Sequence, residues 1–330
     1  MDMTEATTAI EQARLSLLVR QIRLEAAGIN SYELVDPDGG ELPPFTAGAH
    51  IDVHLPNGLI RQYSLSNSPA ERHRYVIAVL RDEKGRGGSK ALHESLKVQD
   101  VVTFSHPRNN FSLGGRARKV MLLAGGIGVT PLKSMAHALE EAGIEFEFHY
   151  CARNAGCVAF GTELAGPWKH GTPNFHYDHG NPADGLDIAG LLREHGEGTH
   201  LFYCGPAGFM QACANAAAHW PAGSVHFEHF KAPEIARPAS DAAPCSFAVK
   251  IASTGQLIDV APGISIADAL NAAGVRIETS CQAGLCGTCK VRYLEGEVDH
   301  QDMILGDGEQ QQWLTACVSR AKGPLLVLDL

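Results

Sequence analysis

The stretch "TSCQAGLCGTC" (residues 279–289) holds three of the chain's nine cysteines, Cys281, Cys286 and Cys289, separated by four residues and then by two. Such a group of thiols can form a disulfide, bind zinc or hold a redox-active centre. The N-terminal residues show no signal-peptide pattern, so we expect a cytoplasmic, reducing environment, where structural disulfides are rare. Zinc and a redox centre remain as the two interpretations.

A fourth thiol, Cys317 in "LTACVSRA", is separated from Cys289 by 27 residues. Three cysteines spaced C-x4-C-x2-C, with a distant fourth, form the plant-type pattern for a 2Fe-2S cluster. Small loop residues such as Gly284 and Gly287 let backbone N–H groups point at the sulfur atoms of the cluster. A zinc site usually pairs two C-x2-C knuckles, and Cys286 with Cys289 supplies only one. The spacing therefore favours the cluster.

The identity of the fourth ligand has one alternative. Cys245 is also available, but it opens a predicted strand far from the cysteine loop, so Cys317 is preferred. The predicted metal ligands are Cys281, Cys286, Cys289 and Cys317.

Composition narrows the class of protein. A length of 330 residues suits two or three domains, and 45% apolar with 19% charged residues is typical of a soluble globular chain. The net charge is -10, with no basic block, which argues against a nucleic-acid partner. No run of about 18 apolar residues occurs, so no membrane span is predicted.

The pattern of residues changes twice along the chain. Residues 14–112 alternate apolar and polar residues in short runs, which predicts an antiparallel β-barrel. Residues 119–152 form a strand, glycine turn, helix and strand, and a further strand and helix follow at 200–218, which predicts a doubly wound α/β sheet. The prolines and small residues of 229–244 are typical of a linker. The predicted domains are 1–113, 114–230 and 245–330, with a linker at 231–244.

The barrel carries a first motif that suits a flavin. "RQYSLSNSP" (61–69) ends a predicted strand. Arg61 can pair with a phosphate, Tyr63 can lie against the flavin ring, and the Ser64 hydroxyl can reach flavin N5. Alone, such a run is most often a solvated strand end.

A second barrel motif, "KGRGGSKALHESL" (84–96), is a glycine-rich turn that leads directly into a helix. The N–H groups of Gly87 and Gly88 and the Ser89 hydroxyl can bind a terminal phosphate at the helix N-terminus. Alone it is most often a loop, but with the first motif on one barrel it favours a flavin. We expect His73 and His93, near these motifs, to be surface residues.

Two motifs in the α/β region suit a dinucleotide. "LLAGGIGVTPLKSM" (122–135) departs from the G-x-G-x-x-G fingerprint, because Pro131 occupies the first helical turn, and Thr130 is expected to cap the helix. "YCGPAGFM" (203–210) follows a strand at the edge where such sheets bind ligands. The residues expected to approach the diphosphate are Gly125, Gly126 and Gly128, and those expected at the nicotinamide are Cys204, Gly205 and Pro206.

Two readings of aromatic and thiol side chains stay open at this level. A buried structural cysteine is the alternative interpretation of Cys204. In "VHFEHF" (225–230), core packing is the default expectation for Phe227, whereas Phe230 lies at the domain edge, where an aromatic ring can cover the flavin.

With these motifs in this order, the chain resembles the phthalate dioxygenase reductase family over about residues 15–330, and vanillate demethylase reductases look similar too. The resemblance rests on "RQYSLSNSPAERHRYVIAV", "GRGGS", "LLAGGIGVTP", "YCGP", "HWPAGSVHFEHF", "CQAGLCGTC" and "CVSRAKGPLLVLDL". It implies an FMN-binding barrel, an NADH-binding α/β domain and a β-grasp plant-type ferredoxin domain. The FMN contacts that it implies are Arg61, Gln62, Tyr63, Ser64, Ala78, Val79, Arg81, Gly87, Gly88, Ser89 and Phe230.

The implied activity is that of the reductase component of a Rieske-type oxygenase system. NADH gives a hydride to FMN, Ser64 and Cys204 lie at that step, and the 2Fe-2S cluster passes single electrons to a separate oxygenase. Residues 241–330 carry 11 acidic and 6 basic residues, so transient docking to a basic patch of the oxygenase by a monomeric reductase is expected. FMN over FAD is inferred from the phosphate loop and the resemblance. NADH over NADPH is implied by the resemblance, because the sequence places neither a clear 2'-phosphate clamp nor a clear ribose-binding acid.

Two other functions compete with this interpretation. A redox-sensing binding module would need a cluster but not both a flavin loop and a nicotinamide pocket. A self-contained oxidoreductase acting on a small molecule would need its own oxygenating site, and the sequence shows neither a mononuclear-iron triad nor Rieske C-x-H pairs.

Overall fold

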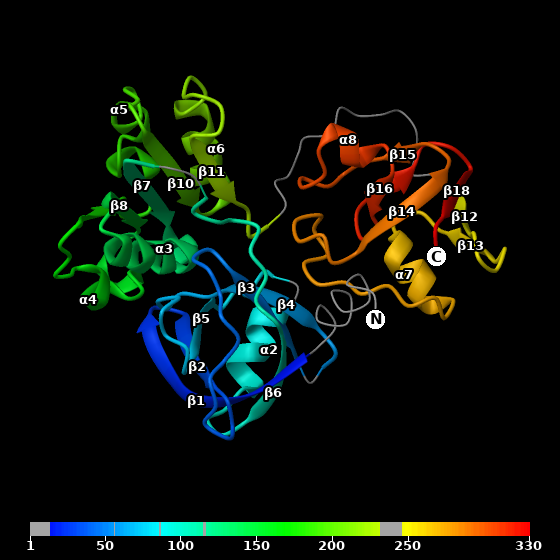
Figure 1. The fold of residues 1–330 in the computed structure, drawn as a ribbon, viewed down its shortest axis with the longest axis horizontal. Helices are drawn as coiled ribbons and strands as arrows, with labels where there is room; N and C mark the ends of the chain where they lie inside the picture. The colour runs from blue at the N-terminus through cyan, green and yellow to red at the C-terminus, as the bar shows by residue number, and fades with distance from the viewer. Residues whose placement is uncertain (1–13, 56, 86, 115–116, 232–245) are drawn as a thin grey trace. The chain divides into compact units, whose positions relative to one another are not determined.

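The structure, a computed structural model, describes residues 14–55, 57–85, 87–114, 117–231 and 246–330. The chain divides into two compact units, Met1–Phe230 and Lys231–Leu330 (Figure 1). Apart from Lys231, the predicted linker lies outside the described residues, and so does Cys245. Among the helices in the described ranges, none has the length and hydropathy of a membrane span.

The N-terminal part of the first unit is a six-stranded antiparallel sheet in the order β4-β3-β6-β1-β2-β5. An isolated bridge between Leu65, just after β4, and Ile77 of β5 joins the two edge strands, so the sheet closes into the predicted barrel. Helix α2 (Gly88–Ser95) lies between β5 and β6, with Gly87 in the left-handed conformation at its N-cap. The strands are β1 (Arg14–Ala26), β2 (Ile29–Val35), β3 (His50–His54), β4 (Ile60–Ser64), β5 (Tyr75–Leu80) and β6 (Val101–Ser105).

The rest of the first unit is a parallel sheet in the order β11-β10-β7-β8-β9. Its strands are β7 (Lys119–Gly125), β8 (Glu145–Ala152), β9 (Gly171–Tyr177), β10 (Thr199–Cys204) and β11 (Val225–Glu228). The chain builds β7, β8 and β9 in one direction and then returns to the other side of β7. The strand order therefore reverses between β7 and β10, which is where doubly wound sheets bind ligands.

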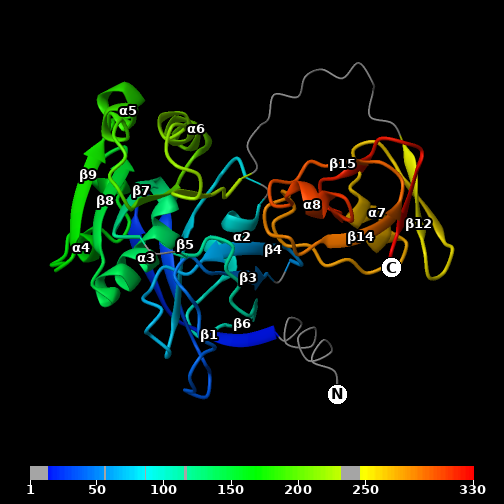
Figure 2. The same cartoon turned by 45° about the horizontal axis from the view of Figure 1, so that its top comes forward.

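Helices cover both faces of this sheet, as Figure 2 shows for α3 on one side and for α5 and α6 on the other. The helices are α3 (Val129–Ala142), α4 (Gly161–Leu164), α5 (Ile188–Leu191) and α6 (Ala207–Ala216), and the 3₁₀ turn η1 (Gly126–Gly128) joins β7 to α3. Barrel residues such as Ala78 and Phe111 share one hydrophobic core with α3 and the sheet. The barrel and the α/β sheet are thus packed together in the first unit.

The second unit is the predicted α+β domain. Its sheet has the order β13-β12-β18-β14-β16, in which β12 and β18 are parallel and the other pairs are antiparallel. Helix α7 (Ile266–Ala272) begins after Ser265, whose hydroxyl accepts a hydrogen bond from the Asp268 N–H at 3.0 Å, an N-cap. The remaining elements are β12 (Phe247–Ile251), β13 (Leu257–Val260), β14 (Lys290–Glu295), β15 (Val298–Asp299), α8 (Asp307–Gln310), β16 (Trp313–Thr315), β17 (Arg320–Ala321) and β18 (Leu325–Leu328).

Candidate functional site

The four predicted cluster ligands lie together in the second unit. Cys281 is in hydrogen-bond contact with both Cys286 and Cys317, and Cys317 also contacts Cys289. The described residues contain no three His, Cys, Asp or Glu groups arranged around a single ion. The thiols instead form a chain of neighbours that can supply two sulfur ligands to each of two irons. The donor set fits a 2Fe-2S cluster.

The cysteine loop depends on glycines for its path. Gly284 has φ +71°, and a Cβ placed there would lie 2.8 Å from Val318 Cγ2 and 2.9 Å from Asp302 Cα. Gly287 has φ +75°, also in the left-handed region that favours glycine. The loop directs the Leu285 N–H to the Cys281 sulfur, with N and Sγ 3.4 Å apart. Such a donor stabilises a thiolate and a metal-bound sulfur alike.

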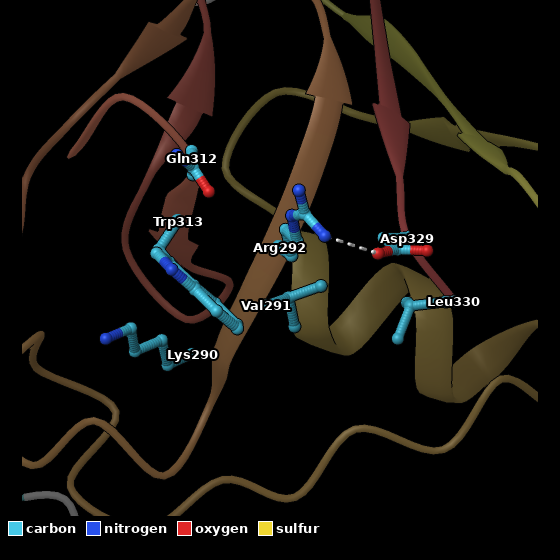
Figure 3. Close-up of a pocket in the computed structure, with 7 residues that line it drawn as sticks. All are labelled: Lys290, Val291, Arg292, Gln312, Trp313, Asp329 and Leu330. Atoms are coloured by element: carbon cyan, nitrogen blue, oxygen red, sulfur yellow. Dashed lines mark ion pairs between the residues drawn. The ribbon is translucent and has the colours of Figure 1, made fainter. Parts of the chain in front are cut away.

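A shallow pocket of about 490 Å³ lies on the same unit, beside the end of the cysteine loop (Figure 3). Its two basic side chains are already paired: Arg292 with Asp329 at 3.6 Å, and Lys290 with Glu309 at 2.6 Å. Lys290 also lies over the Trp313 ring. The pocket therefore adds no net positive charge to the acidic second unit. The residues that line it are Lys290, Val291, Arg292, Gln312, Trp313, Asp329 and Leu330.

The two flavin motifs meet at the N-terminus of α2. A Cβ on Gly88 would lie 2.5 Å from both Cγ and Nε of Arg61, so the arginine side chain rests against the first turn of the helix. The N–H groups of that turn have no acceptor within the helix. The Ser89 hydroxyl oxygen accepts a hydrogen bond from the Asp82 N–H at 3.1 Å, which leaves its proton available to a ligand. A guanidinium beside a helix N-terminus fits a phosphate group.

Strand β5, the predicted floor of the flavin site, is held against α2 by a histidine. His93 Nε2 lies 2.8 Å from the Val79 carbonyl oxygen, and the side chain stays partly exposed. The Val79 side chain packs in the barrel core, and only its backbone can face a flavin. Arg81 makes ion pairs with Glu83 and Glu94, at 2.5 and 2.9 Å. Ala78 is buried on the side of the α/β sheet.

Strand β4 presents the remaining barrel residues of the motif. Gln62 and Tyr63 are partly exposed, whereas Ser64 at the end of the strand is buried. Burial raises the pKa of Tyr63 well above its ordinary value, so the phenol stays neutral. Gln62, Tyr63 and Ser64 therefore suit contact with a flavin ring that lies along β4.

The two dinucleotide motifs pack against each other at the reversal point of the sheet. A Cβ on Gly128 would lie 2.1 Å from the Cys204 carbonyl oxygen, and a Cβ on Gly125 would lie 2.9 Å from Pro206 Cδ. Loop packing therefore requires these two glycines, and their approach to a diphosphate stays a prediction. Gly126, with φ +52°, has no atom within 4 Å of its Cβ position, and it is the glycine that leaves room for a diphosphate.

Two expectations about this region need correction or refinement. Thr130 does not cap α3, because the helix already begins at Val129; its hydroxyl donates a hydrogen bond to the Ile127 carbonyl at 3.1 Å. Pro131 does lie in the first helical turn.

Cys204 is fully buried, and burial keeps its thiol pKa well above the ordinary value. Gly205 follows it, with its Cβ position 3.0 Å from Gly125 Cα.

Sequence reasoning missed the carboxyl group at the centre of this region. Glu228, at the end of β11, pairs in register with Cys204, and its Oε2 accepts a hydrogen bond from the Ser64 hydroxyl at 3.5 Å. His50 of β3 lies opposite Ser64 in register, and its Nδ1 is 4.0 Å from Glu228 Oε1. A lone acid in "VHFEHF", among apolar and aromatic residues at the end of a short strand, was the signal available in the sequence.

Burial shifts both of these groups toward their neutral forms. It raises the pKa of Glu228 to about 8, with the Ser64 hydrogen bond acting in the opposite direction. It lowers the pKa of His50 to about 4, and nearby Arg108 adds to that effect. Near pH 7 the site between Ser64 and Cys204 therefore holds an uncharged carboxyl and an uncharged imidazole.

These shifts predict a pH-dependent stability. Between pH 6.5 and 8 the folded chain keeps a proton on Glu228 that the unfolded chain, with a carboxyl pKa of 4.5, has released, so the free energy of unfolding falls as pH rises. Between pH 4.5 and 6.5 His50 gives the opposite slope and the two offset each other. Relative to wild type, Glu228→Gln should gain roughly 2 kcal/mol from pH 6.5 to 8.

Urea unfolding of both proteins across this range measures the difference. Glu194→Gln, at an exposed position of the same unit, is the matched control and should follow wild type at each pH. Parallel curves for Glu228→Gln and wild type would contradict the buried, protonated carboxyl.

The two phenylalanines at the end of β11 are both at the surface. Phe227 is 47% exposed, although its ring contacts Tyr203 and His229, so the expectation of a core residue was wrong. Phe230 is 39% exposed at the end of the first unit. Its predicted contact with FMN stays a prediction.

Known proteins resemble both the cysteine-containing unit and the chain as a whole. A model of the 2Fe-2S iron-sulfur cluster binding domain matches residues 249–322, which include all four cysteines. Over 323 residues the chain is 54% identical to the reductase subunit of tert-butanol monooxygenase / tert-amyl alcohol desaturase from Aquincola tertiaricarbonis, covering 96% of each. It is 44% identical over 320 residues to the vanillate O-demethylase oxidoreductase of Pseudomonas sp. strain HR199, covering 96% of this chain and all of that one.

The same fold occurs in a solved structure of phthalate dioxygenase reductase, described as a modular structure for electron transfer from pyridine nucleotides to a 2Fe-2S centre. It superimposes with a TM-score of 0.76 at 41% identity, covering 97% of this chain and 99% of the other. The predicted barrel, doubly wound sheet and ferredoxin domain are confirmed. Because several relatives are this similar over nearly their whole length, the chain belongs to the phthalate dioxygenase reductase family.

Proposed function

We propose that this chain is the reductase component of a two-component oxygenase system, in which NADH reduces FMN and the 2Fe-2S cluster delivers single electrons to a separate oxygenase. The observation that carries the proposal is that the flavin motifs and the dinucleotide motifs converge around Ser64, Cys204 and Glu228 in one unit. The four cysteines converge in the other. When bound, FMN accepts a two-electron hydride and releases electrons singly, which is the chemistry that links these two sites.

The residues of the first unit supply binding, orientation and exclusion of water. Arg61 and the N-terminus of α2 would hold the FMN phosphate by charge and hydrogen bonds. Ser64, buried at the end of β4, would turn its hydroxyl proton from Glu228 to the flavin where the hydride arrives. Gly126 offers its backbone to the NADH diphosphate. The neutral Glu228 beside Cys204 would place an uncharged side chain where the flavin and nicotinamide rings meet.

In the second unit the four thiols would hold the cluster, and backbone N–H groups would influence its reduction potential. Hydrogen bonds to cluster sulfurs are one of the means by which proteins set the reduction potential. The N–H of Leu285 is such a donor. The hydrogen bond with Cys281, together with burial, raises the pKa of Cys286, so that cluster assembly must displace a proton there.

Docking of the oxygenase is assigned to the second unit. Its net charge of -5 over residues 241–330, with the basic residues of the surface pocket already paired, suits a positively charged partner surface. We propose that this contact is transient and that the reductase is a cytoplasmic monomer. None of the eight cysteines in the described part of the chain forms a disulfide, which supports a reducing environment.

The test combines the purified chain with the oxygenase encoded beside its gene. NADH should bleach the bound flavin, which heat release should identify as FMN, and should then support turnover by the oxygenase. Raising salt from 50 to 300 mM should slow transfer to the oxygenase by about tenfold and leave flavin reduction by NADH unchanged. Oxidation of a small substrate by the chain alone, or no reduction by NADH, would refute the proposal.

A further inference from the structure

His50 is a buried histidine that none of the binding motifs includes. Its side chain is fully buried, and neither ring nitrogen has a hydrogen-bond partner among the described residues. A buried polar group without a partner is costly, so its retention needs an explanation. The nearest acid is Glu228, whose Oε1 lies 4.0 Å from His50 Nδ1.

Several elements place charged or titratable groups near His50. On its own strand, Asp52 favours the imidazolium form, and after β6, Arg108 disfavours it. These two side chains make an ion pair of their own at 2.6 Å, so their effects on His50 largely cancel. From the neighbouring parallel sheet, β10 and β11 contribute the neutral Cys204 thiol and Glu228. Burial is therefore the main cause that keeps His50 neutral, and Glu228, 4.0 Å away, is the protonated acid placed to give it a proton.

We propose that His50 and Glu228 share one proton, and that this proton moves from the Glu228 carboxyl to His50 when the nicotinamide bound beside them becomes cationic. The inference rests on the proposed function, because it requires a nicotinamide at the Cys204 edge. One O–H bond on Glu228 breaks and one N–H bond forms on His50 Nδ1, so the pair stays neutral overall. The carboxylate then faces the positive ring of NAD⁺. Transfer needs one bridging water or an approach of roughly 1 Å.

The preference of the proton for Glu228 over His50 is small enough for a bound cation to reverse it. The pKa values of about 8 and about 4 place the proton on Glu228. This preference is a factor of about ten thousand. Attraction between the two charges formed 4 Å apart offsets roughly a thousandfold of that preference at an effective dielectric constant of about 20. A cation next to the carboxylate supplies the remaining factor. With NADH, whose ring is neutral, the proton stays on Glu228.

The expected consequence is selective for the oxidised dinucleotide. His50 is a positioning residue that acts through Glu228, so its removal should weaken NAD⁺ binding by about tenfold. Binding of tetrahydro-NADH, a reduced analogue that cannot transfer hydride, should change by less than roughly twofold. A residue with a merely structural role would alter both affinities together.

The experiment uses the FMN- and cluster-loaded protein as wild type, His50→Asn and His50→Gln. Fluorescence titration gives the two affinities, and infrared difference spectra follow the protonated carboxyl band that is lost in Glu228→Gln. In wild type, NAD⁺ should remove this band; in both His50 variants the band should persist. His73→Asn, at an exposed barrel position, should behave as wild type.

Three results would overturn the inference: equal weakening of both dinucleotides, no weakening in either His50 variant, or a carboxyl band that NAD⁺ leaves in place in wild type. If wild type binds tetrahydro-NADH and is reduced by NADH while any of these is observed, the proposed function stands and only the inference fails. A wild-type protein that binds neither dinucleotide would refute the proposed function itself.

Discussion

Replacing Cys286 by serine is expected to abolish the visible spectrum of the 2Fe-2S cluster and electron delivery to the oxygenase, while NADH still reduces FMN. Cys286 is buried and in contact with Cys281, so its loss leaves an iron with one protein thiolate too few. The residues assigned to FMN and NADH all belong to the first unit, Met1–Phe230, and do not include this loop. Anaerobic absorbance titration with NADH measures both centres in one experiment.

The matched control is Cys157→Ser, a partly exposed free cysteine of the first unit. It should keep the cluster spectrum, flavin reduction and transfer to the oxygenase at wild-type levels. An intact cluster spectrum in Cys286→Ser would show that another group replaces this thiol, and the assignment of the four ligands would be wrong.

The second large effect is expected at Gly128. An alanine Cβ there would lie 2.1 Å from the Cys204 carbonyl oxygen and 2.7 Å from the Gly205 N, both backbone atoms that no side-chain rotation can move. The turn before α3 must therefore separate from the end of β10. We expect Gly128→Ala to lower the stability of the first unit by about 3 kcal/mol or more, and to reduce the rate of flavin reduction by at least about a hundredfold.

Gly126→Ala separates this packing role from ligand binding. Its Cβ would meet no atom within 4 Å, so the fold loses only the roughly 1–2 kcal/mol that a left-handed alanine costs. The methyl group should occupy the space assigned to the diphosphate and raise the Kd for NADH about tenfold or more. Thermal unfolding and NADH titration of both variants provide the comparison. Equal stability of the two variants would contradict the packing role of Gly128.

Sequence patterns were sufficient to predict the features that are formed by residues close together in the chain. The spacing of Cys281, Cys286 and Cys289 predicted the cluster loop because the ligands follow one another within a single turn of chain. The alternation of residues 14–112 predicted the barrel strands, since a strand with one buried face repeats every second residue. Gly87 and Gly88 predicted the turn that leads into α2 because a left-handed residue before a helix is a local requirement.

Only the tertiary structure could decide what depends on residues far apart in the chain. Ser64 and Glu228 are separated by 164 positions, yet one hydrogen bond joins them, and His50 reaches the same carboxyl from a third strand. The pKa of a side chain is set by what surrounds it in space, so no local pattern reveals a neutral glutamate at this point. Likewise Gly128 fits a ligand-binding loop by sequence, but the backbone of Cys204 and Gly205 packed against it shows that it is needed for contact with the end of β10.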